Sequence, residues 1–270
     1  MKTILITGAS SGIGKTTAEL FQSRGWNVAA TMRNPDSASG SVEDPSTLVT
    51  RLDVTDPDSI ASAVEKTIAR FGNIDLLLNN AGYGAYGPLE AFSMEQVENQ
   101  FSTNVIGLLA VTKAVLPHMR TAKSGMIVNI SSIGGLMTFP LGSLYHGSKF
   151  AVEGLSESLH FELEPVGIRV KIVEPGMINT DFGGRSFVFE TGDDMPEYQP
   201  AIEGMQRVMQ HYAANVSPPE KVAEVIWQAA NDSSNTLRYR AGDDAHALLD
   251  ARKEQDDETF IGSIKNNMGW

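Results

Sequence analysis

The sequence predicts a doubly wound α/β fold, in which a mainly parallel seven-stranded sheet lies between two layers of helices. Short runs rich in Val, Ile and Leu recur without polar alternation, which is typical of strands buried on both faces. Each run is followed by a longer amphipathic stretch, which is typical of a covering helix. The length of 270 residues suits one α/β domain with a full core. We therefore expect a single domain over residues 1–270.

The elements alternate in chain order. The candidate strands are Thr3–Thr7, Asn27–Thr31, Leu48–Leu52, Asp75–Asn79, Met126–Ser131, Arg169–Glu174 and Leu237–Tyr239. The candidate helices are Gly14–Ser23, Pro57–Phe71, Met94–Met119, Ser148–Glu162 and Pro219–Asn231. Gly25 and Gly72 follow the first two helices, where glycine commonly ends a helix. Strands that alternate with helices imply right-handed crossovers and a parallel sheet.

Three segments fall outside this alternation. Residues 36–45 contain Ser, Pro and Gly and predict a surface loop. Residues 182–218 carry no clear strand, and a long irregular insert of this kind is usually functional, so we expect a substrate-loop insert that acts as a lid. Residues 243–270 form a C-terminal extension, whose acidic stretch Asp243–Glu258 predicts a solvated surface helix.

Composition excludes several classes of protein. The net charge of −12 opposes binding to nucleic acid or to an anionic membrane surface. The absence of cysteine excludes disulfides, thiolate zinc sites and a cysteine nucleophile. The five histidines lack a paired ligand spacing, so we expect no metal. No stretch has the length of a secretory core or a membrane span, and we expect a cytoplasmic protein.

A glycine turn, Thr7–Gly14, joins the first strand to the first helix. Its spacing is G-x-x-x-G-x-G, with Gly8, Gly12 and Gly14. Such glycines let backbone N–H groups approach a pyrophosphate at a helix N-terminus, although Gly is also an ordinary turn residue. The following Lys15 resembles the lysine of an NTPase phosphate loop. That loop needs a glycine five positions before Gly14, where this chain has alanine, so we read Lys15 as a solvated helix residue.

Further motifs follow the turn in a regular order. They are Leu52-Asp53-Val54, Asn79-Asn80-Ala81-Gly82, Asn104, Ser132, Tyr145-x-x-x-Lys149, and Pro175-Gly176 with Thr180. This ensemble resembles the short-chain dehydrogenase/reductase superfamily, whose fold is a Rossmann fold. The glycine spacing and the chain length resemble its compact single-domain branch, and the later part is loosely similar to hydroxysteroid and retinol dehydrogenases. The resemblance implies an NAD(P)-dependent oxidoreductase.

The Tyr145–Lys149 pair carries the expected chemistry. On a helix the two side chains lie about one turn apart on one face. A phenol has a pKa of about 10, and a nearby ammonium lowers this value. Tyr145 can therefore act as a general acid or base. The resemblance implies a catalytic tetrad with Ser132, which would bind the substrate oxygen, and Asn104, which would hold a relay water. The alternative is a surface i,i+4 pair, and the distance in sequence to Ser132 favours the catalytic interpretation.

The resemblance also implies a cofactor site. Its expected residues are Gly8, Ser10, Ser11, Gly12, Ile13, Gly14, Arg33, Asp53, Val54, Asn80, Ala81, Gly82, Tyr145, Lys149, Pro175, Gly176, Ile178 and Thr180. Met32 stands where NAD-specific relatives have an acid, and Arg33 can bind a 2′-phosphate. We therefore expect NADP rather than NAD. The alternative is that Asp36 reaches the ribose.

The substrate and the assembly are less sharply defined by the sequence. Apolar residues in 136–141 and 182–209 suit either a substrate pocket or packing of the lid. We expect a mid-sized apolar ketone, aldehyde or secondary alcohol. The resemblance implies a homodimer or homotetramer formed through helices Met94–Met119 and Ser148–Glu162. The alternative function is an NADP-binding redox sensor without turnover, against which the complete tetrad argues.

Overall fold

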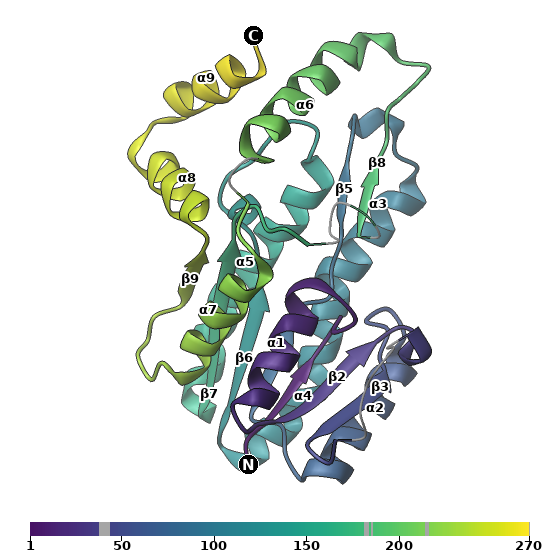
Figure 1. The fold of residues 1–270 in the computed structure, drawn as a ribbon, viewed down its shortest axis with the longest axis vertical. Coiled ribbons are helices and arrows are strands. Elements are labelled where there is room, and N and C mark those ends of the chain that lie inside the picture. Colours follow the sequence, from purple (N-terminus) through teal and green to yellow (C-terminus); the bar gives the residue numbers. More distant parts are fainter. Residues whose placement is uncertain (38–43, 181–183, 185, 214–215, 270) are drawn as a thin grey trace.

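The computed structural model describes residues 1–37, 44–180, 184, 186–213 and 216–269. Its core is a seven-stranded sheet with the strand order β3-β2-β1-β4-β6-β7-β9 (Figure 1). The strands are β1 (Thr3–Ile6), β2 (Asn27–Met32), β3 (Thr47–Arg51), β4 (Leu76–Asn79), β6 (Gly125–Ile130), β7 (Ile168–Pro175) and β9 (Arg238–Ala241). Every pair is parallel, which confirms the predicted sheet. The order reverses between β1 and β4, and this switch point opens a crevice at the carboxyl ends of the strands.

Helices cover both faces of the sheet. They are α1 (Gly12–Ser23), α2 (Pro57–Phe71), α3 (Met94–Phe101), α4 (Leu108–Ala122), α5 (Ser143–Leu163) and α7 (Pro219–Asn231). The side chains of β1 alternate between two cores: Ile4 and Ile6 join the cluster under α1 and α7, and Leu5 joins the cluster under α2 and α4. Helices exclude water from both faces of the sheet. The strands therefore have apolar residues at successive positions, without polar alternation.

Two predicted helices differ in detail from the observed ones. The stretch expected as a helix over 94–119 consists of α3, a π-helical turn (Ser102–Gly107) and α4. The π turn brings Gly107 against Val54, where a Cβ would lie 2.7 Å from the valine Cβ. Helix α5 begins at Ser143, five residues before the expected start, so Tyr145 lies in its first turn. Of the expected surface loop, residues 38–43 lie outside the described part of the chain.

The expectation of an irregular, strand-free segment at 182–218 is wrong for its described residues. The strand β8 (Phe187–Phe189) pairs in parallel with β5 (Gly84–Tyr86) and forms a second, two-stranded sheet. The helix α6 (Gln199–Ala213) follows it (Figure 1). The apolar residues of α6 recur at helical spacing, and Ile202, Met205 and Val208 are buried. Residues 182–183, 185 and 214–215 lie outside the described part.

The C-terminal extension is also more than a solvated helix. It forms α8 (Asp243–Glu254) and α9 (Asp257–Met268), and α9 packs against α6. Each helix exposes acidic residues in its first turn and basic residues in its last turn, and buries apolar residues on its inner side. The buried residues of the two helices join Met205 of α6 and Tyr145 of α5 in one cluster. They are Ala245, Leu249, Phe260, Ile264 and Met268. The extension thus closes a third core above the sheet.

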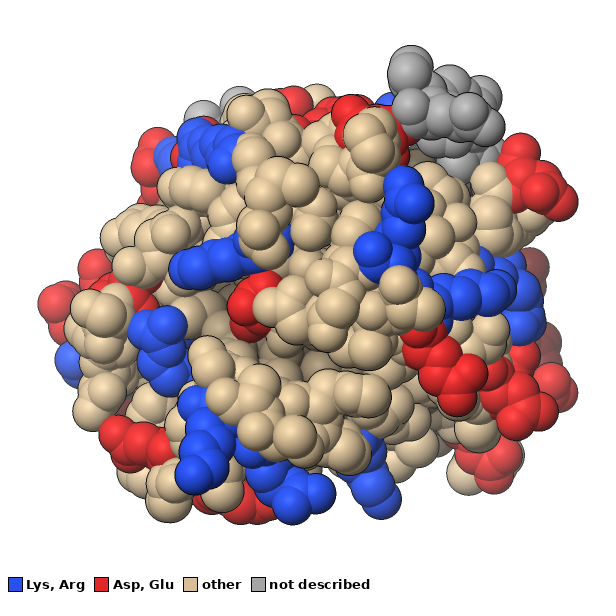
Figure 2. Space-filling view, turned by 90° about the horizontal axis from the view of Figure 1, so that it is seen from below, with Lys and Arg blue, Asp and Glu red and all other residues tan. Residues whose placement is uncertain are grey.

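Charges are mixed on the face seen from below in Figure 1. Figure 2 shows Lys and Arg side chains interspersed there with Asp and Glu around a largely uncharged centre.

Lys15 is solvated as predicted, and it lies 3.9 Å from Glu19 on the next turn of α1. No helix in the described part of the chain combines the length and the hydrophobicity needed to cross a lipid bilayer.

Candidate active site

A cavity of about 880 Å³ opens where β1, β2, β4, β6 and β7 end. Residues from distant segments of the chain meet in its wall. The predicted site residues that line it are Gly8, Ser10, Ser11, Gly12, Ile13, Arg33, Asp53, Val54, Asn80, Ala81, Gly82, Ser132, Tyr145, Lys149, Pro175, Gly176, Ile178 and Thr180. Gly14 and Asn104, by contrast, are buried behind this wall. The structure therefore brings together nearly all the residues that the motifs single out.

The glycine turn is built for close approach of the backbone. Gly8 and Gly12 have φ values of 68° and 53°, in the left-handed region. A Cβ on Gly8 would lie 3.0 Å from the Ala81 Cα, and one on Gly14 would overlap the Gly8 carbonyl. The N-cap Ser11 makes no side-chain capping bond. The first turn of α1 is thus an uncapped helix N-terminus, which is a form that binds anions.

Asn80 braces this turn from the neighbouring strand. Its Nδ2 donates to the carbonyl oxygens of Thr7 at 2.9 Å and of Gly8 at 3.1 Å. In return, the Thr7 hydroxyl accepts from the backbone N–H groups of Asn80 and Ala81, both at 3.0 Å. The asparagine that was expected to contact cofactor therefore shapes the glycine turn with its side chain.

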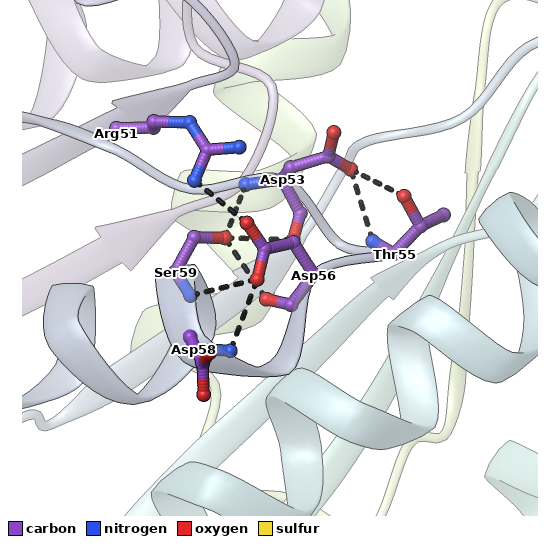
Figure 3. Close-up of polar contacts among 6 residues, drawn as sticks. All are labelled: Arg51, Asp53, Thr55, Asp56, Asp58 and Ser59. Carbon is purple, nitrogen blue, oxygen red and sulfur yellow. Dashed lines mark hydrogen bonds and ion pairs between the residues drawn. The ribbon is translucent and has the colours of Figure 1, made fainter.

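Asp53 lies at the end of the cavity that also contains Arg33, and its carboxylate is fixed in place (Figure 3). Thr55 donates to Oδ1 of Asp53 through its backbone N–H at 3.0 Å and its hydroxyl at 2.8 Å. Arg51 binds Asp56, the N-cap of α2, at 2.8 Å, and this hydrogen bond lowers the pKa of the Asp56 carboxyl. Arg51 is thereby engaged elsewhere, whereas Arg33 is exposed at the cavity wall.

Tyr145, Lys149 and Ser132 converge on one wall. The Lys149 Nζ donates to the Ile130 carbonyl at 2.8 Å and lies 5.9 Å from the Tyr145 ring centroid. Ser132 accepts from the Gly134 N–H at 3.0 Å and hydrogen-bonds Tyr145. Both members of the pair are buried, at 8% exposure each.

Burial decides the pKa values of this pair. It raises the pKa of Tyr145 above its usual 10, although the Ser132 hydrogen bond acts in the opposite direction. It lowers the pKa of Lys149 to about 8. The net direction for the Tyr145 pKa is therefore opposite to the one expected from a nearby ammonium. The cost of desolvating the phenolate outweighs the stabilisation by the Ser132 hydrogen bond.

Asn104 lies behind the cavity wall. It is 2% exposed, on the π turn. Its Oδ1 accepts from the Tyr83 N–H at 3.0 Å, and its Nδ2 donates to the Tyr83 carbonyl at 2.8 Å and to the Ser148 hydroxyl at 3.0 Å. This amide ties the chain after β4 to α5. A Cβ on Gly82 would lie 3.1 Å from this amide.

The motifs missed part of the wall. Tyr86 lies against Tyr145 and Phe187, with ring centroids 5.5 Å and 5.4 Å apart. His146 accepts from the Phe139 N–H at 3.0 Å and lies 3.0 Å from the Gly134 carbonyl, and burial lowers its pKa. Its two ring nitrogens thus brace the loop after Ser132. Tyr86 was missed because three residues of β5 are too short a run to show strand periodicity.

The inner part of the cavity is mainly apolar. The apolar and aromatic residues that line it are Tyr86, Phe92, Phe139, Met177, Phe187, Val188, Met205 and Met209. Ile202 and Val208 on α6 are instead buried in the core. The apolar residues of the 182–218 insert thus divide between the cavity wall and the core. No group of three or more potential metal-ligating His, Asp or Glu side chains occurs among the residues that the structure describes.

A Rossmann sheet, a glycine turn at its switch point and a Tyr-x-x-x-Lys pair define a class of oxidoreductases. The chain belongs to the short chain dehydrogenase family, whose model matches residues 2–189. An oxidoreductase of Schizosaccharomyces pombe is 45% identical over 88% of this chain and 100% of its own. A 3-ketodihydrosphingosine reductase of Bacteroides thetaiotaomicron is 39% identical over 88% of this chain and 87% of its own.

Solved structures agree with this assignment. A short-chain dehydrogenase of Streptomyces avermitilis matches with a TM-score of 0.84 and 35% identity, over 94% of this chain and 92% of its own. The NADP-bound structure of ElxO matches with a TM-score of 0.71 and 30% identity, over 88% of this chain and 97% of its own. The fold and the family are therefore established together.

Proposed function

We propose that this protein is an NADP-dependent oxidoreductase that interconverts a carbonyl group and an alcohol, with Tyr145 as the general acid and base. One observation carries the proposal. Tyr145, Lys149 and Ser132 share the wall of a cavity whose other part contains the uncapped glycine turn. A cofactor at the turn and a substrate at Tyr145 can then occupy one continuous space.

The residues at the glycine turn fit a dinucleotide. Side chains at Gly8 and Gly14 would fill space that the turn needs, and α1 presents an uncapped N-terminus. The exposed Arg33 favours NADP, because a guanidinium binds a 2′-phosphate strongly. Asp36 is not among the described residues that line the cavity, which weakens the alternative in which it binds the ribose. Two structural relatives carry NADP in their structures.

When bound, the nicotinamide supplies or accepts the hydride. Tyr145 gives a proton to the carbonyl oxygen in reduction and removes it from the alcohol in oxidation. Ser132, already hydrogen-bonded to Tyr145, orients the substrate oxygen. Lys149 is held by the Ile130 carbonyl and stabilises negative charge on Tyr145 during the transfer. Asn104 supports this arrangement through Ser148.

The substrate we propose is a mid-sized apolar ketone, aldehyde or secondary alcohol. The aromatic and methionine side chains near Tyr145 favour apolar groups. The reductase of Bacteroides thetaiotaomicron is named for a ketone, which supports reduction as the direction. Residues 182–218, with β8 and α6, contribute Phe187, Val188, Met205 and Met209 to the wall, and we propose that this segment is the substrate lid.

We also propose assembly into a homodimer or homotetramer through the helices around α4 and α5. Ile106, Phe150 and Phe161 are exposed apolar residues there, at 59%, 46% and 69%. Large exposed apolar side chains on neighbouring helices are typical of contact surfaces. Analytical ultracentrifugation should give two or four copies in wild type and fewer in Phe161→Glu. A monomeric wild-type protein would contradict this.

The decisive experiment combines binding and turnover. NADPH and NADH are titrated by nicotinamide fluorescence, and carbonyls from small aldehydes to steroid ketones are then tested for NADPH oxidation. We expect tight NADPH binding, turnover of an apolar carbonyl, and loss of turnover with retained binding in Tyr145→Phe. Binding without any turnover would favour the redox sensor. Absence of nucleotide binding would overturn the whole proposal.

A further inference from the structure

A buried charge network lies one helical turn beyond Lys149. Glu153 follows Lys149 by four residues on α5 and is 4% exposed. Glu174, on β7, is 1% exposed. Arg238 of β9 reaches both carboxylates: its Nε lies 2.9 Å from Glu153 Oε2 and 3.4 Å from Glu174 Oε1. Two buried acids thus share one guanidinium directly behind the catalytic wall.

The two acids are not equivalent. Arg238 donates a hydrogen bond to Glu153, whereas neither oxygen of Glu174 accepts one from the described residues. Burial, together with repulsion from Glu153, raises the pKa of Glu174 to about 7. Burial also raises the pKa of Glu153, but Ser131, Arg238 and Lys149 act against it. The hydrogen bond from Arg238 therefore favours Glu153, rather than Glu174, as the carboxylate of the pair.

Glu153 acts on Lys149. Residues four apart on a helix are neighbours on its surface. The attraction of Glu153 raises the pKa of Lys149, against the larger effect of burial, which lowers it to about 8. The ammonium has one backbone acceptor, the Ile130 carbonyl at 2.8 Å, and this dipole does not replace a full negative charge. Without the carboxylate, Lys149 would lose its proton at a lower pH.

We propose that Glu153, clamped by Arg238, is a positioning residue for the reaction that keeps the ammonium of Lys149 charged beside Tyr145. This inference rests on the proposed function, because a charged Lys149 matters for proton transfer through Tyr145. The clamp also extends outward, since the other arm of Arg238 binds Glu157 at 2.6 Å near the surface.

The charged neighbours of Glu153 come from three elements. Helix α5 supplies Lys149 and Glu157, β7 supplies Glu174, and β9 supplies Arg238. Arg240, also on β9, acts on Glu174 and is paired with Asp250 of α8. Within this set, Arg238 and Lys149 are the two cations that act on Glu153. Among the described residues, Glu153 is the anion whose attraction raises the pKa of Lys149. Neutralising Glu153 therefore leaves the ammonium without a carboxylate in this role.

The test compares Glu153→Gln with Glu157→Gln, which removes a carboxylate from the same guanidinium on its exposed side. The full chain is labelled at the lysine ¹³Cε, the Lys149 resonance is assigned by its loss in Lys149→Met, and its titration is followed by NMR. We expect the Lys149 midpoint to fall by about one pH unit in Glu153→Gln, the lower end of the effect of a nearby charge. Glu157→Gln and the charge-retaining Glu153→Asp should leave it close to wild type.

The activity readout is separate. The alkaline limb of the kcat/KM profile should move with the Lys149 midpoint, up to about tenfold lower at a given alkaline pH in Glu153→Gln. An unchanged midpoint overturns the inference, even if Glu153→Gln melts at a lower temperature. If Glu153→Gln does not fold, Glu153→Met, which removes the same charge and suits a buried site, takes its place, with the same fall expected. A shifted midpoint in a protein that reduces no carbonyl supports the charge-holding role and contradicts the proposed function.

Discussion

Asp244 accepts a hydrogen bond from the backbone N–H of Met177 at 2.6 Å. The contact joins α8 to the chain just after β7, next to Gly176, where a Cβ would overlap the Asp244 carboxylate. The Gly176 N–H is bound in turn by the Ala241 carbonyl at 2.9 Å. The C-terminal extension therefore holds the Pro175–Met177 turn, which lines the cavity.

Asp244→Ala should loosen this turn. We expect a loss of about 1–3 kcal/mol in the free energy of unfolding, because a backbone N–H is left unpaired. We also expect weaker NADPH binding, since the turn lines the cavity. Chemical denaturation and fluorescence titration measure the two effects. Asp243→Asn is the matched control, because its carboxylate is 96% exposed and bound only at the surface, by Lys221. Equal effects in both variants would contradict this role of Asp244.

Arg33→Ala should weaken the binding of NADPH much more than the binding of NADH. Loss of a guanidinium that binds the 2′-phosphate should raise the Kd for NADPH about 10- to 100-fold. The Kd for NADH should change little, because NADH lacks this phosphate. Arg51→Ala is the control, since Arg51 pairs with Met32 in the sheet, is bound to Asp56 and is not among the described residues that line the cavity. Equal losses for NADPH and NADH in Arg33→Ala would contradict the NADP preference.

Asn104→Ala should act on stability and on the site together. It removes three hydrogen bonds of a residue that is 2% exposed, and leaves the buried-side N–H of Tyr83 without its acceptor. We expect a loss of about 2–5 kcal/mol in the free energy of unfolding. Thermal and urea melts measure it. If Asn104 served only to hold a water, activity would fall while the melting temperature stayed near wild type.

Glu174→Gln should change how stability depends on pH. Burial raises the folded pKa of Glu174 from 4.5 to about 7, so the folded state holds this proton more tightly than the unfolded state. The stabilisation is complete below pH 4.5 and is lost as the pH rises through about 7, which amounts to about 3 kcal/mol. Glu174→Gln should remove this loss, and urea melts at about pH 5 and about pH 8 measure it. The exposed Glu65→Gln should behave as wild type, and a wild-type pH dependence in Glu174→Gln would contradict the assignment.

The parallel sheet and the cavity wall around the motifs could be predicted from the sequence. The β1 run is apolar at every position because Ile4 and Leu5 face different cores, and that pattern is local. The glycine turn and the Tyr145–Lys149 spacing are local as well. Each of these features is set by a few neighbouring residues, so reading along the chain recovers it.

The remaining features depend on contacts between distant segments. β5 becomes a strand because Gly84–Tyr86 pairs with residues of the insert, and neither segment alone has a strand-length pattern. The acidic extension packs inward because α6 covers it, which the charge pattern does not reveal. The rise in the pKa of Tyr145 likewise reflects the burial of the whole wall rather than its nearest charge.

The third core also bears on how the protein is made. Domains emerge from the ribosome from the N-terminus onward, and the sheet strands β1–β4 can pair early. The cluster around Tyr145, however, includes Phe260 and Met268 of α9. A nascent chain can therefore build most of its sheet and still have an open chamber above it. Tyr145 acquires its dry surroundings only once α9 has been synthesised and has docked.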